Sequence, residues 1–83
     1  MVGKAEDLLA SMGFGQLRVR LHGGTLARIE VAPSKFAHVI KLRQCITGEL
    51  KRLGFTYVTL DLEGFRSGSM NEVLPPTAFK GLT

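Results

Sequence analysis

Apolar residues recur at every third or fourth position along residues 4–12, which is the spacing of one buried helix face. Glu6 and Asp7 stand where the first turn of this helix is expected, and the helix dipole favours negative charge there. Gly13 follows the last apolar position, as a helix stop does. The pattern predicts a short amphipathic helix whose apolar face consists of Ala5, Leu8, Leu9 and Met12.

Strict alternation of apolar and polar residues replaces this spacing in residues 16–22 and again in residues 26–31. Alternate side chains of a strand point to opposite faces, so each segment is predicted to be a strand with one apolar face. Gly23 and Gly24 separate the two segments, which predicts a β-hairpin. The polar face of this hairpin is expected to carry Arg18, Arg20, Arg28 and Glu30.

The length of the hairpin loop decides which residues face each other across the two strands. A two-residue loop would pair Val19 with Arg28, so only an odd loop length aligns the apolar positions of both strands. Two three-residue loops satisfy this condition, residues 22–24 and residues 23–25. We favour residues 22–24, because this loop puts Gly24 at the position that needs a positive φ.

A second helical region follows the hairpin. Pro33 ends the second strand, and Ser34 is a candidate N-cap for what comes next. Helical spacing then runs through residues 36–53 with a phase shift near Lys41, so one bent helix and two joined helices both fit. Gly54 is the expected end of this region.

Residues 57–63 alternate once more and predict a third strand, with Val58, Leu60 and Leu62 facing inward. The helical region between the second and third strands has the length of a crossover connection, which places its helix on one face of the sheet. The predicted fold class is therefore α+β, a two-layer α-β-β-α-β domain whose three-stranded sheet has helices on one face. We expect residues 1–74 to form this domain and residues 75–83 to form a tail.

Length and composition narrow the classes of function. With 83 residues, of which 45% are hydrophobic and 22% charged, the chain is expected to be one globular domain. No apolar run approaches the roughly 20 residues of a membrane span and no secretion signal is visible, so a cytoplasmic protein without membrane partners is expected. The single cysteine cannot form an internal disulfide. The net charge of +4 favours anionic partners.

The polar face of the predicted sheet is the first candidate binding site. Arg18, Arg20 and Arg28 offer forked donors suited to phosphate or carboxylate groups. Glu30 and Asp61 supply negative charges on the same face. A polar face that is only solvated explains this composition equally well.

A segment rich in glycine and serine, residues 64–69, directly follows the third predicted strand. Successive backbone N–H groups of such a loop can form an anion-binding concavity, and Arg66 would add a positive charge to it. Ser67 and Ser69 are candidate polar residues of the same pocket. A flexible tail is the alternative interpretation.

The remaining reactive side chains are expected to be structural. Cys45 lies among apolar helix positions, so a buried and unreactive thiol is expected. His22 and His38 have no neighbours at metal-ligand spacing, and we expect no metal site. No nucleophile and base are recognisable as a pair, so we expect neither a catalytic residue nor a cofactor in this chain.

Three segments of the chain together resemble a known family. Residues 18–23, 27–31 and 53–71 have the order and spacing of the C-terminal region of the LarE family, the ATP-dependent sacrificial sulfur transferases once labelled ExsB-like. The resemblance extends over residues 6–74. It implies an N-terminal PP-loop ATP pyrophosphatase domain that adenylates a carboxylate of a pyridinium mononucleotide. A cysteine of the family then gives up its sulfur, a step toward the nickel-pincer cofactor of lactate racemase.

The resemblance also implies roles for particular residues. Arg18, Arg20 and Arg66 match positions expected to contact the phosphate of the nucleotide substrate. Glu30 and Asp61 would be polar residues of the pocket. The PP-loop signature is absent from these 83 residues, and Cys45 does not match the segment that holds the donor cysteine. The chain therefore resembles the accessory part of a two-domain enzyme.

Three hypotheses for the function follow. In the first, the chain is an accessory domain that assists homo-oligomer assembly and binds the phosphorylated pyridinium mononucleotide beside a PP-loop domain, fused or separate. The alternative is a small basic module for RNA or another anionic partner. Aromatic residues do not interleave with the basic ones, so nucleic acid is not the expected partner. A third hypothesis is an assembly module that pairs through a strand edge.

Overall fold

The computed structural model describes residues 1–65. Along the chain, one helix precedes a β-hairpin, further helices follow it, and a third strand comes last. In chain order the elements are α1 (Val2–Ser11), β1 (Leu17–His22), β2 (Leu26–Val31), the 3-10 turn η1 (Pro33–Lys35), α2 (Phe36–Lys41), α3 (Arg43–Arg52) and β3 (Tyr57–Leu60). The expected order α-β-β-α-β is confirmed, with its second helical region divided into two helices. The expected boundary between domain and tail lies outside the described residues.

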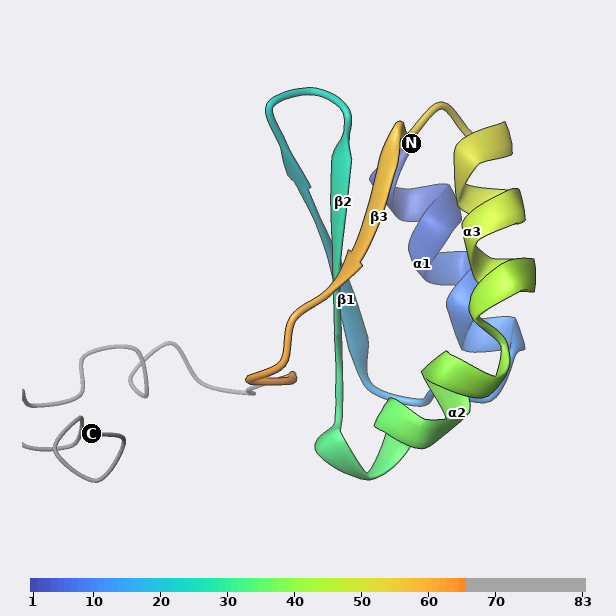
Figure 1. Ribbon diagram of the computed structural model, residues 1–83, viewed down its shortest axis with the longest axis vertical. Coiled ribbons are helices and arrows are strands. Elements are labelled where there is room, and N and C mark those ends of the chain that lie inside the picture. Colours follow the sequence, from blue (N-terminus) through green and yellow to red (C-terminus); the bar gives the residue numbers. More distant parts are fainter. Residues whose placement is uncertain (66–83) are drawn as a thin grey trace, which may run out of the picture.

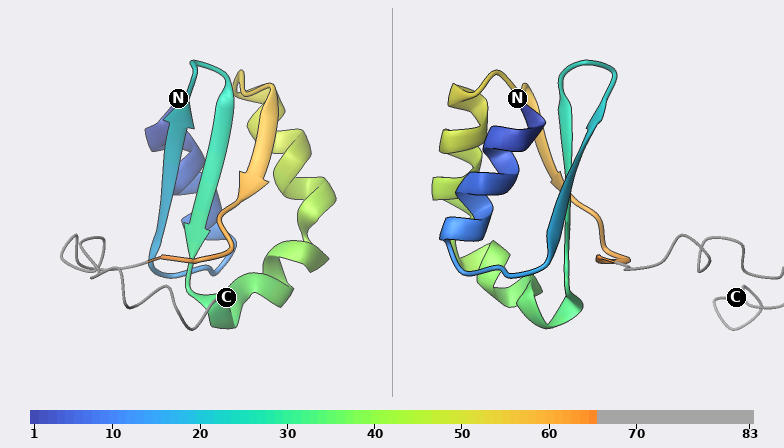
Figure 2. Two further views of the ribbon diagram at one scale, coloured as in Figure 1. Left: turned by 60° about the vertical axis from the view of Figure 1, so that its left-hand side comes forward. Right: turned by 180° about the vertical axis from the view of Figure 1, so that it is seen from behind.

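Within residues 1–65, all the helices lie on one side of the sheet and none covers the other side, which we call the open face (Figures 1 and 2). This arrangement confirms the predicted two-layer α+β fold. One apolar core fills the space between the two layers. Its buried side chains are Ala5, Leu9, Phe14, Val19, Ala27, Ile29, Val31, Val39, Ile46, Leu50 and Phe55.

β2 is the central strand, with β1 antiparallel on one side and β3 parallel on the other. Val31 faces Leu17 across the β1–β2 pair, so the hairpin loop consists of residues 23–25. The favoured loop of residues 22–24 is therefore wrong. That loop would have put Val31 opposite Gly15, whereas the observed register gives it an apolar partner. Both loop glycines adopt positive φ angles, 59° and 80°.

The helices differ from the predicted ones at their ends. α1 begins at Val2, so Glu6 and Asp7 lie beyond its first turn. Ser34 lies inside η1 and does not cap α2, because the 3-10 turn that begins at Pro33 occupies the position where the cap was expected. Leu42 separates α2 from α3, which accounts for the phase shift in the apolar pattern.

β3 ends at Leu60, before the predicted end at Glu63. Val58 and Leu60 are partly buried against the core, as predicted. Leu62 is 79% exposed, so its predicted inward position is wrong. The strand pattern fails here because the backbone turns at Asp61, whose carbonyl accepts a hydrogen bond from the Gly64 N–H at 3.0 Å.

After this turn the chain crosses the end of β2 on the open side of the sheet. The Phe65 N–H donates to the Val31 carbonyl at 2.8 Å. Gly64 makes the crossing with a φ of 82°, and a Cβ on it would lie 2.9 Å from the Val31 carbonyl oxygen and 3.0 Å from Cδ of Pro33. The close approach therefore requires glycine at this position.

We predict that Gly64→Ala lowers the free energy of unfolding by about 2–4 kcal/mol, since the left-handed backbone and the contact with Val31 both oppose a side chain. Gly13→Ala is the matched control. Gly13 has a φ of 90°, but a Cβ there would meet nothing within 4 Å, so only the backbone cost of about 1–2 kcal/mol is expected. Urea denaturation of both variants measures the difference. Equal losses would contradict a tight crossing at Gly64.

Candidate functional site

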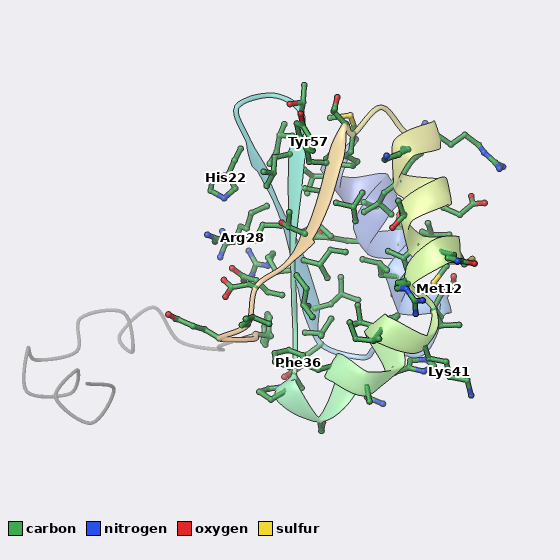
Figure 3. The ribbon with its side chains drawn as sticks, viewed as in Figure 1. Met12, His22, Arg28, Phe36, Lys41 and Tyr57 are labelled. Carbon is green, nitrogen blue, oxygen red and sulfur yellow. The ribbon has the colours of Figure 1, made fainter. Side chains whose placement is uncertain are left out.

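The open face of the sheet carries the arginines singled out from the sequence. Arg18 lies opposite Glu30, and Arg20 lies opposite Arg28, so the four side chains share one face as predicted. Figure 3 shows the labelled side chains of Arg28 and His22 on the side of the sheet away from the helices. The β1–β2 register is what brings these charges together.

Glu30 is the most buried charged residue on this face. Its side chain is only 10% exposed although no helix covers it. Arg28 Nη2 donates to Glu30 Oε2 at 2.9 Å, and Arg20 Nε lies 3.7 Å from the same oxygen. A carboxylate removed from water needs such cationic partners, because burial penalises an unpaired charge. The two arginines thus make the position of Glu30 tenable.

Arg28 also reaches the third strand. Its Nε lies 3.5 Å from Asp61 Oδ2, and the Asp61 side chain is 16% exposed. The Asp61 N–H donates to the Ile29 carbonyl at 2.9 Å, which fixes Asp61 beside Glu30 in the neighbouring strand. The guanidinium of Arg28 therefore bridges two carboxylates that would otherwise repel each other. We call Arg20, Arg28, Glu30 and Asp61 the open-face cluster.

The sequence indicates Arg28 as one of three candidate anion-binding residues on the polar face, but it does not indicate that Arg28 bridges two carboxylates. Its role depends on the pairing of β2 with the end of β3, which brings Asp61 within reach. The only local signal was its spacing of two residues from Glu30, which puts both side chains on one face of a strand.

The open-face cluster is balanced in charge, since two arginines face two carboxylates. Among residues 1–65, Arg18 forms no ion pair, although it lies on the same face one alternate position before Arg20. A guanidinium without an ion pair in this part of the chain, beside a neutralised cluster, can bind an external anion. The structure thus brings Arg18, Arg20, Glu30 and Asp61 together as expected, whereas Arg66, Ser67 and Ser69 lie outside the described residues.

Among the other reactive side chains, Cys45 and His38 lie away from this face, whereas His22 lies on it. Cys45 is exposed, so the expected buried thiol is wrong: its place between core positions of α3 leaves it on the solvent side of the helix. His38 Nε2 lies 3.2 Å from the Met12 carbonyl oxygen and its ring packs 4.8 Å from that of Phe14, which confirms a structural role. His22 is exposed at the end of β1. Within the described part of the chain, no group of three potential ligands could hold a metal ion.

We predict that Arg28→Met lowers the free energy of unfolding by about 1–3 kcal/mol, because the buried Glu30 carboxylate loses its closest hydrogen-bond donor. Arg28→Met combined with Glu30→Met should recover at least half of that loss, since replacing both partners removes the uncompensated charge. A double-mutant cycle in urea measures the coupling. Additive losses would show that the two side chains do not stabilise each other.

Comparison with known proteins finds two that are similar in sequence to this chain. No protein-family profile matches the chain. The chain is 46% identical over 70 residues, 84% of its length, to pyridinium-3,5-bisthiocarboxylic acid mononucleotide synthase of Lactiplantibacillus plantarum, which is LarE. It is 44% identical over 77 residues, 88% of its length, to an uncharacterized protein of Synechocystis sp..

The chain spans 25% of the length of the first relative and 28% of the second. Among the described residues, no helix has the length and hydropathy that a membrane crossing requires. The similarity confirms the resemblance derived from residues 18–23, 27–31 and 53–71. This chain resembles one part of LarE, about a quarter of that protein, as a LarE-like C-terminal domain would.

Proposed function

We propose that the chain acts as the accessory C-terminal domain of a LarE-like sulfur transferase and binds the phosphate of a pyridinium mononucleotide on its open face. The name of the relative from Lactiplantibacillus plantarum specifies a mononucleotide product, and a mononucleotide carries a phosphate. The similarity to LarE supports a place in nickel-pincer cofactor biosynthesis. The open face supports the recognition of an anion.

The observation that carries this proposal is the difference between Arg18 and Arg28. Arg28 is held by Glu30 and Asp61, whereas Arg18 has no ion-pair partner among the described residues. Arg18 and Arg20 stand at alternate positions of β1, which places their Cα atoms about 7 Å apart on one face. Two guanidinium groups at this spacing can converge on the oxygens of one phosphate.

Glu30 restrains one member of this pair, Arg20. It holds Arg20 at 3.7 Å through a single oxygen, so the Arg20 side chain stays over the sheet while 45% of it remains exposed. An incoming phosphate thus meets a partly ordered donor and loses less side-chain entropy on binding. Arg66 would add a third donor from beyond the described residues.

The chemistry of sulfur transfer belongs, in this proposal, to other parts of the enzyme. The resemblance implies that a PP-loop domain binds ATP and adenylates the substrate carboxylate, and that a separate cysteine supplies the sulfur. We propose that this chain meets that domain as a fused or separate partner in the cytoplasm and takes part in a homo-oligomer. Its own residues bind and orient the phosphate.

The alternative of an RNA-binding module receives less support from the geometry. Two of the three arginines on the open face have carboxylate partners, which reduces the positive field that a nucleic-acid backbone requires. Retention of the chain on RNA at physiological salt, with a steep salt dependence, would favour the alternative over the mononucleotide.

We predict that Arg18→Gln, Arg20→Gln and Arg66→Gln each weaken the binding of a pyridinium mononucleotide by about tenfold or more, since a charge-assisted contact contributes about 1.5–3 kcal/mol. The free energy of unfolding should change by less than about 0.5 kcal/mol at Arg18, whose side chain is exposed. Isothermal titration of the full chain measures the affinity.

Arg52→Gln is the control for this series. Arg52 lies on α3, on the other side of the sheet, and its side chain is 76% exposed. The substitution removes the same charge and should leave mononucleotide affinity unchanged. An equal loss of affinity with Arg52→Gln would show that the binding depends only on the net charge of the chain. Unchanged affinity in all three arginine variants would contradict the proposed site.

A further inference from the structure

The two edges of the sheet are built differently. At the β1 edge, Glu6 of α1 reaches over the strand, and its Oε2 accepts a hydrogen bond from the Val19 N–H at 2.9 Å. Arg18 and Arg20 add charge to the same strand. Occupied amides and charged side chains are devices that prevent another strand from pairing at an edge. The β1 edge is therefore protected at Val19.

The β3 edge has none of these devices. The N–H groups of Tyr57 and Asp61 donate to the carbonyls of Thr25 and Ile29, on the β2 side. Because the direction of backbone groups alternates along a strand, Val58 and Leu60 direct their N–H and C=O groups away from β2. Residues Tyr57–Leu60 include neither a charged side chain nor a proline. Within residues 1–65, no strand pairs with this edge of β3 and none of these devices protects it.

A groove runs beside the open edge, between β3 and α3. Figures 1 and 2 show α3 in the helical layer, on the face of the sheet that carries the core. The groove continues into a hollow of about 140 Å³ between α3 and the sheet. Ile40, 52% exposed, lies at its rim. The residues of α3 and β3 that line the outer groove are Arg43, Gln44, Thr47, Gly48 and Val58.

We propose that this groove takes an extended, acidic segment of a partner polypeptide, which pairs with β3 as a fourth strand. Backbone pairing with Val58 and Leu60 would provide the hydrogen bonds, and alternate apolar side chains would enter the hollow under α3. Arg43 lines both the groove and the hollow, and its side chain donates only to the Ile40 carbonyl, at 3.1 Å, among the contacts of the described residues. An acidic side chain of the partner would pair with it.

Charge and space favour a partner segment over a second copy of the chain. α3 carries Arg43, Lys51 and Arg52, and its single acidic residue, Glu49, lies 3.5 Å from Arg52. Pairing β3 with β3 of a second copy would bring two positively charged α3 helices together. The N–H of Phe65, the last described residue, donates to the Val31 carbonyl at the end of β2. β3 therefore lies between Phe65 and the groove. This proposal concerns the edge of the sheet and does not rest on the proposed phosphate site.

The test uses the full chain, labelled with ¹⁵N, and a synthetic peptide as the probe. The peptide has seven residues and blocked ends, with valine at positions 1, 3 and 7 and glutamate at position 5, so that these four side chains share the face turned toward α3. A control peptide has lysine in place of the glutamate. We expect the glutamate peptide to shift the amide resonances of Val58 and Leu60 and to slow their hydrogen exchange, and the lysine peptide to bind about two- to fivefold more weakly.

Substitutions at residues that line the groove provide a second test. Gly48 lies in α3, and a Cβ there would meet nothing within 4 Å, so Gly48→Glu should fold while filling the groove with a negative side chain. We expect it to weaken binding of the glutamate peptide by at least about tenfold. Gly48→Ala, the matched control, should bind as the original chain does. Arg43→Glu should reverse the preference in favour of the lysine peptide.

Several results would overturn the proposal. Unchanged Val58 and Leu60 resonances with saturating peptide would do so, as would shifts confined to Val19 and its neighbours. Slow exchange at Val58 and Leu60 without peptide would show that the groove is already covered. If that protection is independent of concentration, the chain's own C-terminal residues are the occupant, and if it grows with concentration, a second copy is.

Discussion

The structure depends on one constraint, which is that its helices can cover only one face of a three-stranded sheet. α1, α2 and α3 all lie on that face and bury one core, so the other face must remain compatible with water. Charged side chains meet this need. Their charges must also be neutralised by ion pairs, because residues at the centre of even an uncovered sheet lose contact with water. Glu30 is the clearest case, since its neighbours leave its side chain 10% exposed.

The arginines of this face differ in the number of carboxylates that they contact. Arg28 joins Glu30 to Asp61 and so connects the central strand with the end of β3. Arg20 shares the Glu30 carboxylate at a longer distance, and Arg18 has no ion pair among the described residues. The same network that stabilises the open face therefore leaves one side able to accept an external anion. We propose that this anion is a phosphate, because the relative from Lactiplantibacillus plantarum is named as a mononucleotide synthase.

The sequence predicted the layers and the polar face because their signals are local. Alternation located β1 and β2, and glycines marked the ends of α1 and α3. The features that depend on contacts between residues distant in sequence were not predicted. The loop of residues 23–25 follows from the pairing of Val31 with Leu17, and the exposure of Leu62 follows from the turn at Asp61. The bridging role of Arg28 required the pairing of β2 with β3. The exposure of Cys45 depends on how α3 is rotated against the sheet, which nearby apolar residues only partly indicate.

We propose that the open face recognises the phosphate of a pyridinium mononucleotide. A crystal structure of the full chain with the mononucleotide bound tests it most directly. The account predicts phosphate oxygens about 3 Å from the guanidinium nitrogens of Arg18 and Arg20, with Arg28 still bonded to Glu30. A phosphate bound on the helical side of the sheet, or one that displaces Arg28 from Glu30 while leaving Arg18 unoccupied, would contradict it.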